Sequence, residues 1–342
     1  AQGSALPFDW RLLLMIKFLI KRILLTIPVL LGVIIIVFFI SRALPGDPVV
    51  NFLTSNYTEE EYKAQEEKMG LDKPLLEQLW NYIVGIVTRF DLGNSYTTGL
   101  PVMKELGSRI WITVKLGLMS CAVTALIGVP LGIISATKQY SALDYVVTSM
   151  SILFAAMPGF WLALMSIIIF TQTLNWLPAS GLYSWKHYIL PVVCNAFMAM
   201  AITTRMTRSS MLEVIRQDYI STARAKGLKE VLVIQRHALK NAIIPVITVI
   251  GNQCSVIIGG SVVIESIFSI AGMGTLLVTS INARDYPTVL GVTLVISMFV
   301  CAVNLIVDIA YCVADPRMKA QLISGTKRRN IRRKVMKEGG LT

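Results

Sequence analysis

The sequence predicts an all-α polytopic membrane protein with about six transmembrane helices. Three observations predict this class: 54% of the 342 residues are hydrophobic, only 15% are charged, and the apolar residues gather into long uncharged runs. Soluble proteins carry roughly 25% charged residues, so this chain has too little charge to meet water on every side. The formal net charge is +12, but nucleic-acid-binding proteins are not usually so apolar. The lipid bilayer is therefore a predicted partner, and nucleic acid is not.

Six runs are long enough to cross a bilayer, whose hydrocarbon core of about 30 Å needs ~20 apolar residues in a helix. They cover residues 23–40, 116–136, 145–174, 188–204, 242–264 and 289–313. The fourth run is the shortest, and Asp308 is the one charged residue in the sixth.

The basic residues predict that both termini are cytosolic, because Lys and Arg near span ends favour the cytoplasmic side. With the N-terminus inside, 22 of the 32 Lys and Arg residues fall in the cytosolic segments 1–22, 137–144, 205–241 and 317–342. The predicted regions are a cytosolic segment 1–22, a first transmembrane helix 23–41, an extracytoplasmic helical segment 42–110, core transmembrane helices 2–6 over 111–316, and a basic tail 317–342.

The first apolar run is predicted to be an uncleaved anchor. It is longer than the apolar region of a signal peptide, and no A-x-A cleavage site follows it. Residues 1–5 open the chain without a methionine, and no prediction rests on them.

Two segments outside the spans have patterns of their own. Amphipathic stretches at 60–69 and 75–87, separated by Asp72-Lys73-Pro74, predict two short extracytoplasmic helices. The segment 265–288 is apolar but interrupted by glycines. It is either a re-entrant stretch that dips into the protein or an amphipathic helix in the membrane interface.

No residue set in the chain suggests catalysis. A P-loop is absent, since Gly-Lys never occurs, and the two histidines lie fifty residues apart without metal-ligand spacing. All five cysteines fall within apolar runs, where they are expected to pack as small hydrophobes. The chain is therefore predicted to be a non-catalytic membrane subunit that binds no metal or cofactor itself.

The segment 205–241 is too polar to cross a membrane and is rich in helix formers. Its centre, D-Y-I-S-T-A-R-A-K-G-L at 218–228, predicts a short helix that Asp218 or Ser221 caps and that Gly227 ends with a positive φ. Small alanines make this helix slim enough to enter a groove on another protein. The competing interpretation is an inside loop that only follows the charge rule.

Polar residues inside the spans mark either a translocation path or contacts between helices. The path candidates are Asn195, Asn252, Gln253 and Asn304. Asp308 is expected to pair with basic residues at the cytosolic end. Glu265, at the outer end of the fifth span, either pairs with Arg284 or belongs to a gate.

Several motifs together resemble a known family. S-T-A-R-A-K-G at 221–227 is similar to the E-A-A-x-x-x-G loop of ABC importer permeases, and its spacing resembles the dipeptide, oligopeptide and nickel branch. The further motifs are L-P-G-D-P at 44–48, D-L-G-N-S-Y at 91–96, P-V at 101–102, R-x-x-x-T-x-x-L at 109–116, W-L-P-A-S-G at 176–181, G-G-S-V-V-I-E-S-I-F at 259–268, R-D-Y-P at 284–287 and D-P-R at 315–317. Their order along most of the chain resembles the first of that family's two permease subunits. Ala271 departs from the pattern, which usually has Pro before Gly-Met-Gly.

This resemblance implies a type I ABC importer permease fold in a prokaryotic plasma (inner) membrane. The chain would form half of the translocation pore. Its partners would be a second homologous permease, two cytosolic ATPases that bind ATP and Mg, and an extracytoplasmic substrate-binding protein. The substrate would be a peptide or a related solute such as glutathione or a nickel chelate.

The resemblance also implies that helix 218–228 is a coupling helix seated on one ATPase. The residues expected to couple the two proteins are Asp218, Tyr219, Ser221, Thr222, Ala223, Arg224, Lys226 and Gly227. A short helix near 265–288, close to the outer mouth, would help to gate the path.

Two other functions fit the composition. An ion-coupled secondary transporter needs an ionisable group near the midplane, whereas Asp308 and Glu265 lie near span ends. A membrane scaffold that docks a cytosolic partner through 205–241 is the second alternative. Substrate uptake in a reconstituted complex would separate the scaffold from a transporter.

Overall fold

The computed structural model describes residues 8–43, 45–53 and 56–314 of the chain. This described part is built of helices and contains no β-strand. The helices are α1 (Phe8–Ala43), α2 (Glu59–Met69), α3 (Leu75–Arg89), α4 (Val102–Thr137), α5 (Ala142–Ala156), α6 (Gly159–Ser166), α7 (Lys186–Ile215), α8 (Asp218–Ala225), α9 (Glu230–Leu232), α10 (Leu239–Ile267), α11 (Met273–Ala283) and α12 (Tyr286–Ala314). The predicted tail 317–342 and the D-P-R motif at 315–317 lie outside the described residues.

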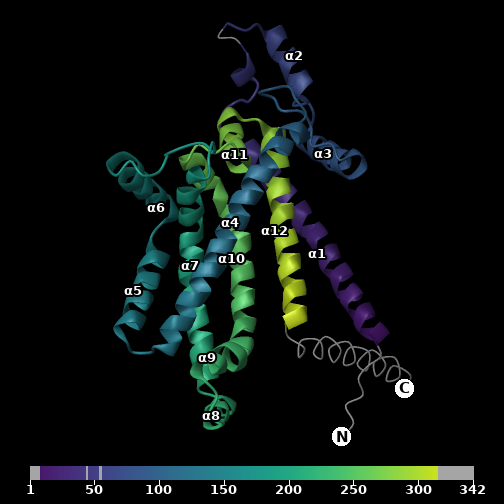
Figure 1. The fold of residues 1–342 in the computed structure, drawn as a ribbon. Coiled ribbons are helices and arrows are strands. Elements are labelled where there is room, and N and C mark those ends of the chain that lie inside the picture. The colour runs from purple at the N-terminus through teal and green to yellow at the C-terminus, as the bar shows by residue number, and fades with distance from the viewer. Residues whose placement is uncertain (1–7, 44, 54–55, 315–342) are drawn as a thin grey trace, which may run out of the picture.

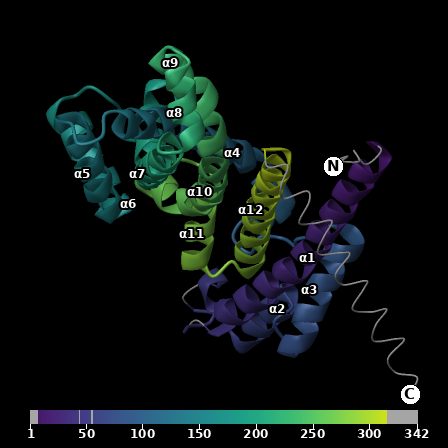
Figure 2. The ribbon, with the colours of Figure 1, turned by 90° about the horizontal axis from the view of Figure 1, so that it is seen from below.

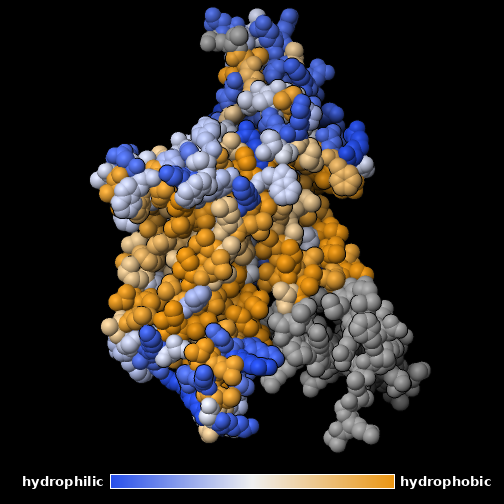
Figure 3. Space-filling model, in the orientation of Figure 1, coloured by the Kyte–Doolittle hydropathy of each residue, from blue (hydrophilic) through white to orange (hydrophobic). Residues whose placement is uncertain are grey.

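Within the described residues, five helical stretches are long and apolar enough to cross a membrane, and they contain the first, second, fourth and fifth predicted runs and most of the sixth. They are Leu19–Ala43, Val102–Thr137, Lys186–Ile215, Glu230–Ile267 and Tyr286–Ala310. Figure 1 shows α2, α3 and α11 at one end of this bundle and α8 at the other. The hydrophobic surface forms a band between two hydrophilic ends, as a membrane protein requires (Figure 3).

The third predicted run is not one straight helix. It divides into α5 and a second piece, Gly159–Thr173, and the two are bent by 103° at their junction. The break falls at Met157, which is extended at φ −80° and ψ 129°, directly before Pro158. Proline disfavours the helical conformation in the residue before it, so an apolar run can keep its hydropathy and still lose its direction here. The described chain thus has five spans, or six if the bent pair crosses as one.

The predicted loop 205–241 is shorter than expected, because helices enter it from both ends. α7 continues to Ile215, and the helical run to α10 begins at Glu230. Pro245 lies inside α10. Arg, Met, Leu and Glu are good helix formers, so these polar segments extend the membrane helices beyond their apolar parts.

Two of the long helices, α4 and α7, pack unusually closely. α4 carries a small residue at every fourth position: Ser120, Thr124, Gly128 and Gly132. These positions face backbone carbonyls of α7 that repeat at the same interval, those of residues 192, 196, 200 and 204. A Cβ at Gly132 would lie 2.6 Å from the carbonyl oxygen of Thr204. Small residues let helix backbones approach in a membrane, where the hydrophobic effect does not hold helices together.

The two extracytoplasmic helices predicted from the amphipathic pattern are present as α2 and α3. A capping box starts α2, in which Thr58 and Glu61 bond reciprocally, and Gly70 ends it in the left-handed conformation. Pro74 precedes α3 directly. Asp72-Lys73-Pro74 therefore separates the helices as the sequence indicates.

Candidate functional site

α8 lies at the end of the bundle opposite α2 and α3 (Figure 1). Gln217 is its N-cap residue and makes no side-chain capping bond, so the prediction that Asp218 or Ser221 caps it is wrong. Asp218 instead occupies the first turn, where a negative charge suits the helix dipole. Gly227 follows the helix with φ +78°, which confirms the predicted left-handed turn.

The inner face of α8 is anchored in a buried cluster. Ile220 is fully buried and Ala223 is 6% exposed. They pack with buried residues of three neighbouring segments, namely Ala136, Met211, Val233, Ile234, Ala238 and Ala242. α8 is therefore joined by side-chain packing to α4, to α7 and to the beginning of α10. A displacement of α8 is transmitted to these helices because close-packed interiors pass strain to their neighbours.

The outer face of α8 is exposed and polar. Six of the eight predicted coupling residues lie on it or just after it, with exposed side chains: Asp218, Tyr219, Ser221, Thr222, Arg224 and Lys226. Gly227 is exposed as well, whereas Ala223 faces inward, so its side chain is not part of the outer surface.

Two of these exposed residues also bond within the chain. The Arg224 guanidinium binds the carboxylate of Glu230 through two hydrogen bonds, of 3.1 and 2.7 Å. Asn241 donates from its amide to the hydroxyl of Tyr219, at 2.8 Å. Both bonds cross the turn between α8 and the helical run that leads into the membrane, and so they help to hold α8 at a fixed angle.

A buried ion pair near this end was not predicted from the sequence. The carboxylate of Asp144, at the start of α5, accepts two hydrogen bonds from Arg208 of α7, at 2.7 and 2.9 Å. Ser135 of α4 donates to the same carboxylate, and so does the backbone N–H of Tyr140, at 3.0 Å. One carboxylate thus joins three helices, α4, α5 and α7.

The candidate path residues do not gather into one site within the chain. Ser255 of α10 donates to the amide oxygen of Asn304 on α12 at 2.8 Å, so Asn304 helps to join these helices. Asn252 is exposed and Gln253 is half-buried on α10. The amide nitrogen of Asn195, on α7, is buried and has no partner within the described residues.

Asn252 belongs to an exposed stripe along α10 that continues through Val256, Gly259 and Gly260. A Cβ at either glycine would meet no atom within 4 Å. This stripe, made of one amide, one valine and two glycines, is a face that α10 leaves uncovered in the single chain.

Glu265 is fully buried at the other end of α10. Its carboxylate accepts a hydrogen bond of 2.7 Å from the backbone N–H of Gly274, in the first turn of α11. The Arg284 guanidinium donates to the carbonyl of Pro45, so Glu265 and Arg284 bond to different partners. A Cβ at Gly272 would lie 2.3 Å from the Glu265 carboxylate, which explains the glycine in the Gly-Met-Gly motif.

The segment 265–288 contains α11, a short apolar helix that packs on α10, α12 and α4. Met273, Gly274, Leu276 and Ser280 form its buried face. It lies at the same end of the bundle as α2 and α3 (Figure 1).

The structural role of Asp285, which follows α11, was also not predicted from the sequence. Its buried carboxylate accepts hydrogen bonds from the Ser95 hydroxyl, the backbone N–H of Tyr96 at 3.0 Å and the Thr288 hydroxyl at 2.9 Å. These bonds tie the D-L-G-N-S-Y segment to the R-D-Y-P segment, so two motifs almost 190 residues apart form one contact. Burial raises the pKa of Tyr96 to about 12.

Asp308 pairs as expected with a basic residue at the α8 end of the bundle. Its carboxylate lies 3.0 Å from the guanidinium of Arg22 on α1. Within the described residues, no group of three or more His, Cys, Asp or Glu side chains could hold a metal ion.

Two family models match the chain. The binding-protein-dependent transport system inner membrane component matches residues 128–320, and the N-terminal model of a membrane component of such systems matches residues 15–117.

Among curated proteins, the chain is 39% identical over 314 residues to a putative peptide transport system permease protein of Brucella melitensis, covering 90% of this chain and 99% of that protein. It is 40% identical over 333 residues to the dipeptide transport system permease protein DppB of Alkalihalophilus pseudofirmus, covering 89% and 100%. It is 36% identical over 305 residues to the glutathione transport system permease protein GsiC of Pectobacterium atrosepticum, covering 89% and 99%.

Solved structures share the fold. The chain superposes on the inward-facing MetNI methionine ABC transporter with a TM-score of 0.52 and 17% identity, over 62% of this chain and 97% of that one. An amino acid ABC transporter solved with histidines gives a TM-score of 0.51 at 14% identity, over 61% and 94%.

Proposed function

This chain belongs to the family of binding-protein-dependent transport system inner membrane components, and from that premise we propose that its substrates are peptides or related small solutes. It is a multi-pass permease subunit of an ABC importer with the type I fold, as the sequence motifs indicated. The family works with ATPase and substrate-binding components. The names of its relatives support the substrate class, since dipeptides, oligopeptides and glutathione all contain peptide bonds.

We propose that α8 is the helix through which this permease receives work from an ATPase. The observation that carries the proposal is the division of α8 into two faces. Its polar outer face is free at the end of the bundle, while Ile220 and Ala223 lock its inner face to three membrane helices. A coupling element needs both properties, because a partner can shift a conformational equilibrium only through contacts that differ between the two states.

The proposed assembly follows from this division of labour. In this assembly, α8 of each permease binds one ATPase. A second homologous permease and a second ATPase complete the transporter, and the ATPases bind ATP and Mg. The α8 end faces the cytosol and the α2–α3 end faces the extracytoplasmic binding protein. The excess of Lys and Arg in 205–241 supports this orientation.

Ion coupling finds little support in the described carboxylates of the spans. Asp308 is paired with Arg22, and Glu265 is bonded to the first turn of α11. Asp144 is held by Arg208. Each of these groups has at least one structural partner within the described residues, although Oε1 of Glu265 is buried without one. ATP-driven coupling through α8 is therefore the mechanism that we prefer.

A bulky residue on the outer face of α8 tests the role of this helix. We expect Ser221→Trp to weaken ATPase binding to the purified permease by at least roughly tenfold and to abolish peptide-stimulated ATP hydrolysis. The chain should still reach the membrane with its normal melting temperature, because Ser221 is exposed. The matched control is Glu60→Trp, which puts the same side chain on the exposed surface of α2 at the opposite end.

The control should retain ATPase binding. Wild-type ATPase binding by Ser221→Trp would refute the coupling role of α8 without touching the peptide assignment. That assignment is tested separately by uptake of labelled dipeptides and tripeptides, which should cease when the permease gene is deleted.

A further inference from the structure

Two cavities lie one after the other along the seam between α3 and α12. The first has a volume of about 250 Å³ and is lined by polar and aromatic residues of α1, α3 and the start of α12. The second, of about 340 Å³, is lined only by apolar residues. Gln78, Tyr82 and Ile86 of α3 follow one another at four-residue spacing, so a single face of this helix borders both.

The polar cavity contains hydrogen-bond donors that the chain leaves unused. Arg42 binds the side-chain oxygen of Gln78 through two nitrogens. Among the residues that the structure describes, its third guanidinium nitrogen, Nη1, and the hydroxyl of Tyr82 are buried without a partner. Burying such groups unpaired costs free energy, which a bound hydrogen-bond acceptor would offset. The positive charge of Arg42 favours an anionic acceptor.

The aromatic rings of this cavity hold the guanidinium in place. Its carbon lies 4.7 Å from the ring centre of Phe38 and 4.2 Å from that of Tyr286. Within the described residues Arg42 forms no salt bridge. Stacked guanidinium groups keep their donors free for planar recognition of carboxylate or phosphate.

The position of the cavity indicates which anion is available. Arg42 lies in the last turn of a span, Leu19–Ala43, where the hydrocarbon core gives way to the headgroup layer. α3 beside it exposes large apolar side chains, among them Leu76, Trp80 and Val87. Apolar and Trp side chains on an amphipathic helix are typical of a helix that lies in the membrane interface. Figure 3 shows this region as a ledge at the border of the hydrophobic band.

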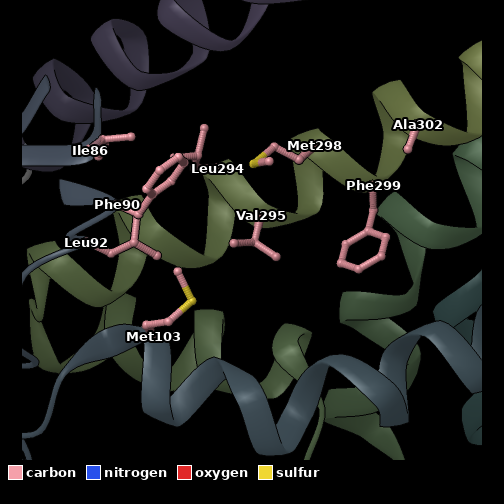
Figure 4. A pocket seen from close by; sticks show the side chains of 9 residues that line it. All are labelled: Ile86, Phe90, Leu92, Met103, Leu294, Val295, Met298, Phe299 and Ala302. Atoms are coloured by element: carbon pink, nitrogen blue, oxygen red, sulfur yellow. The ribbon is translucent and has the colours of Figure 1, made fainter. Parts of the chain in front are cut away.

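The apolar cavity continues the seam deeper into the band. Figure 4 shows Leu294, Val295, Met298 and Phe299 of α12 arranged along it, with Phe90 and Met103 opposite. From Leu294 to Ala302, both of which line the apolar cavity, α12 rises about 12 Å. A groove of this length and chemistry suits part of a hydrocarbon chain.

We propose that the α3–α12 seam binds one phospholipid, with its phosphate at Arg42 and Tyr82 and one acyl chain in the groove along α12. The phosphate accepts from Arg42 Nη1 and from the Tyr82 hydroxyl, with Lys73 and Asn81 at the rim of the same cavity. The headgroup pins α3 to α1 and α12, and the acyl chain fills the groove that Met298 and Ala302 border.

The proposal is tested by native mass spectrometry of the purified transporter. We expect the wild-type complex to retain phospholipid on this chain after extensive detergent exchange. Tyr82→Phe removes only the hydroxyl, and it should lower the affinity for added phosphatidylglycerol roughly two- to tenfold, as the loss of one hydrogen bond does. Arg42→Gln should lower the affinity for phosphatidylglycerol further. Arg42 also binds Gln78, so if Arg42→Gln misfolds, the milder Tyr82→Phe decides the test.

A second pair of variants tests the groove. Ala302→Phe fills the apolar cavity and should expel the lipid. Ile306→Phe, one turn further along α12 and also exposed, adds the same ring outside the cavity and should retain it.

Three results would overturn the proposal. The first is equal lipid retention in the wild type, Tyr82→Phe and Ala302→Phe. The second is displacement of the lipid by millimolar inorganic phosphate alone, which would make the cavity a site for a free anion. The third is loss of the second permease from Ala302→Phe with unchanged lipid content, which would assign the groove to a protein partner.

Discussion

Asp144 shows how far the effect of one side chain can reach in this molecule. Its carboxylate receives hydrogen bonds from Arg208, Ser135 and the backbone of Tyr140, and only 3% of its side chain is exposed. The bent pair α5–α6 has few other polar attachments to the bundle. The pair Asp144–Arg208 therefore fixes where the bent pair α5–α6 begins.

Removing this carboxylate should destabilise the protein. We expect Asp144→Ala to lower the free energy of unfolding by about 3 kcal/mol, because it leaves the largely buried charge of Arg208 without a partner. Thermal unfolding of the purified permease in detergent measures the effect. Lys63→Ala, which breaks the exposed Lys63–Glu59 pair on α2, is the control and should change the stability by no more than about 0.5 kcal/mol. Equal melting temperatures for the two variants would contradict the structural role of Asp144.

Among local features, the turn after α8 could be predicted from the sequence but its cap could not, and among distant pairs only the basic partner of Asp308 was expected. The positive φ at Gly227 follows from the chemistry of glycine after a helix. The partners Asp144 and Arg208 are separated by 64 residues, and Asp285 and Ser95 by 190. No local pattern encodes such contacts. Asp285 and Ser95 lie in two motifs of the sequence, R-D-Y-P and D-L-G-N-S-Y, but neither motif by itself shows that the two are in contact.

At the scale of elements, the contact between α4 and α7 depends on the absence of side chains. Gly128 and Gly132 face backbone oxygens of α7, and a Cβ would lie within about 3 Å of them. At Ser120 the two helix backbones are also close, so that its hydroxyl donates to the carbonyl of Val192 at 3.3 Å. The fit therefore extends over four turns of each helix.

A single methyl group on this surface should be costly. Gly132→Ala places a Cβ 2.5 Å from that of Thr207, so we expect a loss of stability of about 1–3 kcal/mol from overpacking. Gly107→Ala is the matched control in the same helix, because a Cβ there meets nothing within 4 Å. The control should be neutral or stabilise by up to about 1 kcal/mol, since Ala is the better helix former. A melting temperature of Gly132→Ala at or above that of Gly107→Ala would show that the helices have room to separate.

The break between α5 and α6 shows why one predicted element differs from the structure. Hydropathy measures how apolar a run is and how long it is, but it does not record direction. The turn of 103° depends on one dipeptide, Met157-Pro158, within an otherwise continuous apolar run. Other prolines in this chain, such as Pro28 and Pro130, lie inside unbroken helices. Proline alone therefore did not identify the break.

The whole molecule has two chemically different ends. One end carries α2 and α3 with their acidic and aromatic residues, and the other carries α8 with Arg224 and Lys226 (Figure 1). Figure 2 views the molecule from the α8 end. The spans between them are apolar. The distribution of Lys and Arg along the sequence predicts that the α8 end is cytosolic.

Cysteine labelling in whole cells would establish the sidedness. In a variant whose five native cysteines are replaced, we expect Glu60→Cys to react with a membrane-impermeant maleimide from outside the plasma membrane. Lys226→Cys should react only after the membrane is opened, because α8 is assigned to the cytosol. The reverse pattern would invert the orientation and remove α8 from the reach of a cytosolic ATPase.

The close fit of α4 against α7 has a mechanical consequence. α7 has 30 residues, which gives a rod about 45 Å long that ends next to α8, and α4 is fastened to it at four successive turns. Two rods joined so closely bend and slide far less than either would alone. A push of 3 Å at one end would then tilt the pair by about 8° and move the far end by a similar distance about a central pivot. The two helices therefore move as one rigid unit. A small displacement of their ends at one face of the membrane produces a displacement of similar size at the other face.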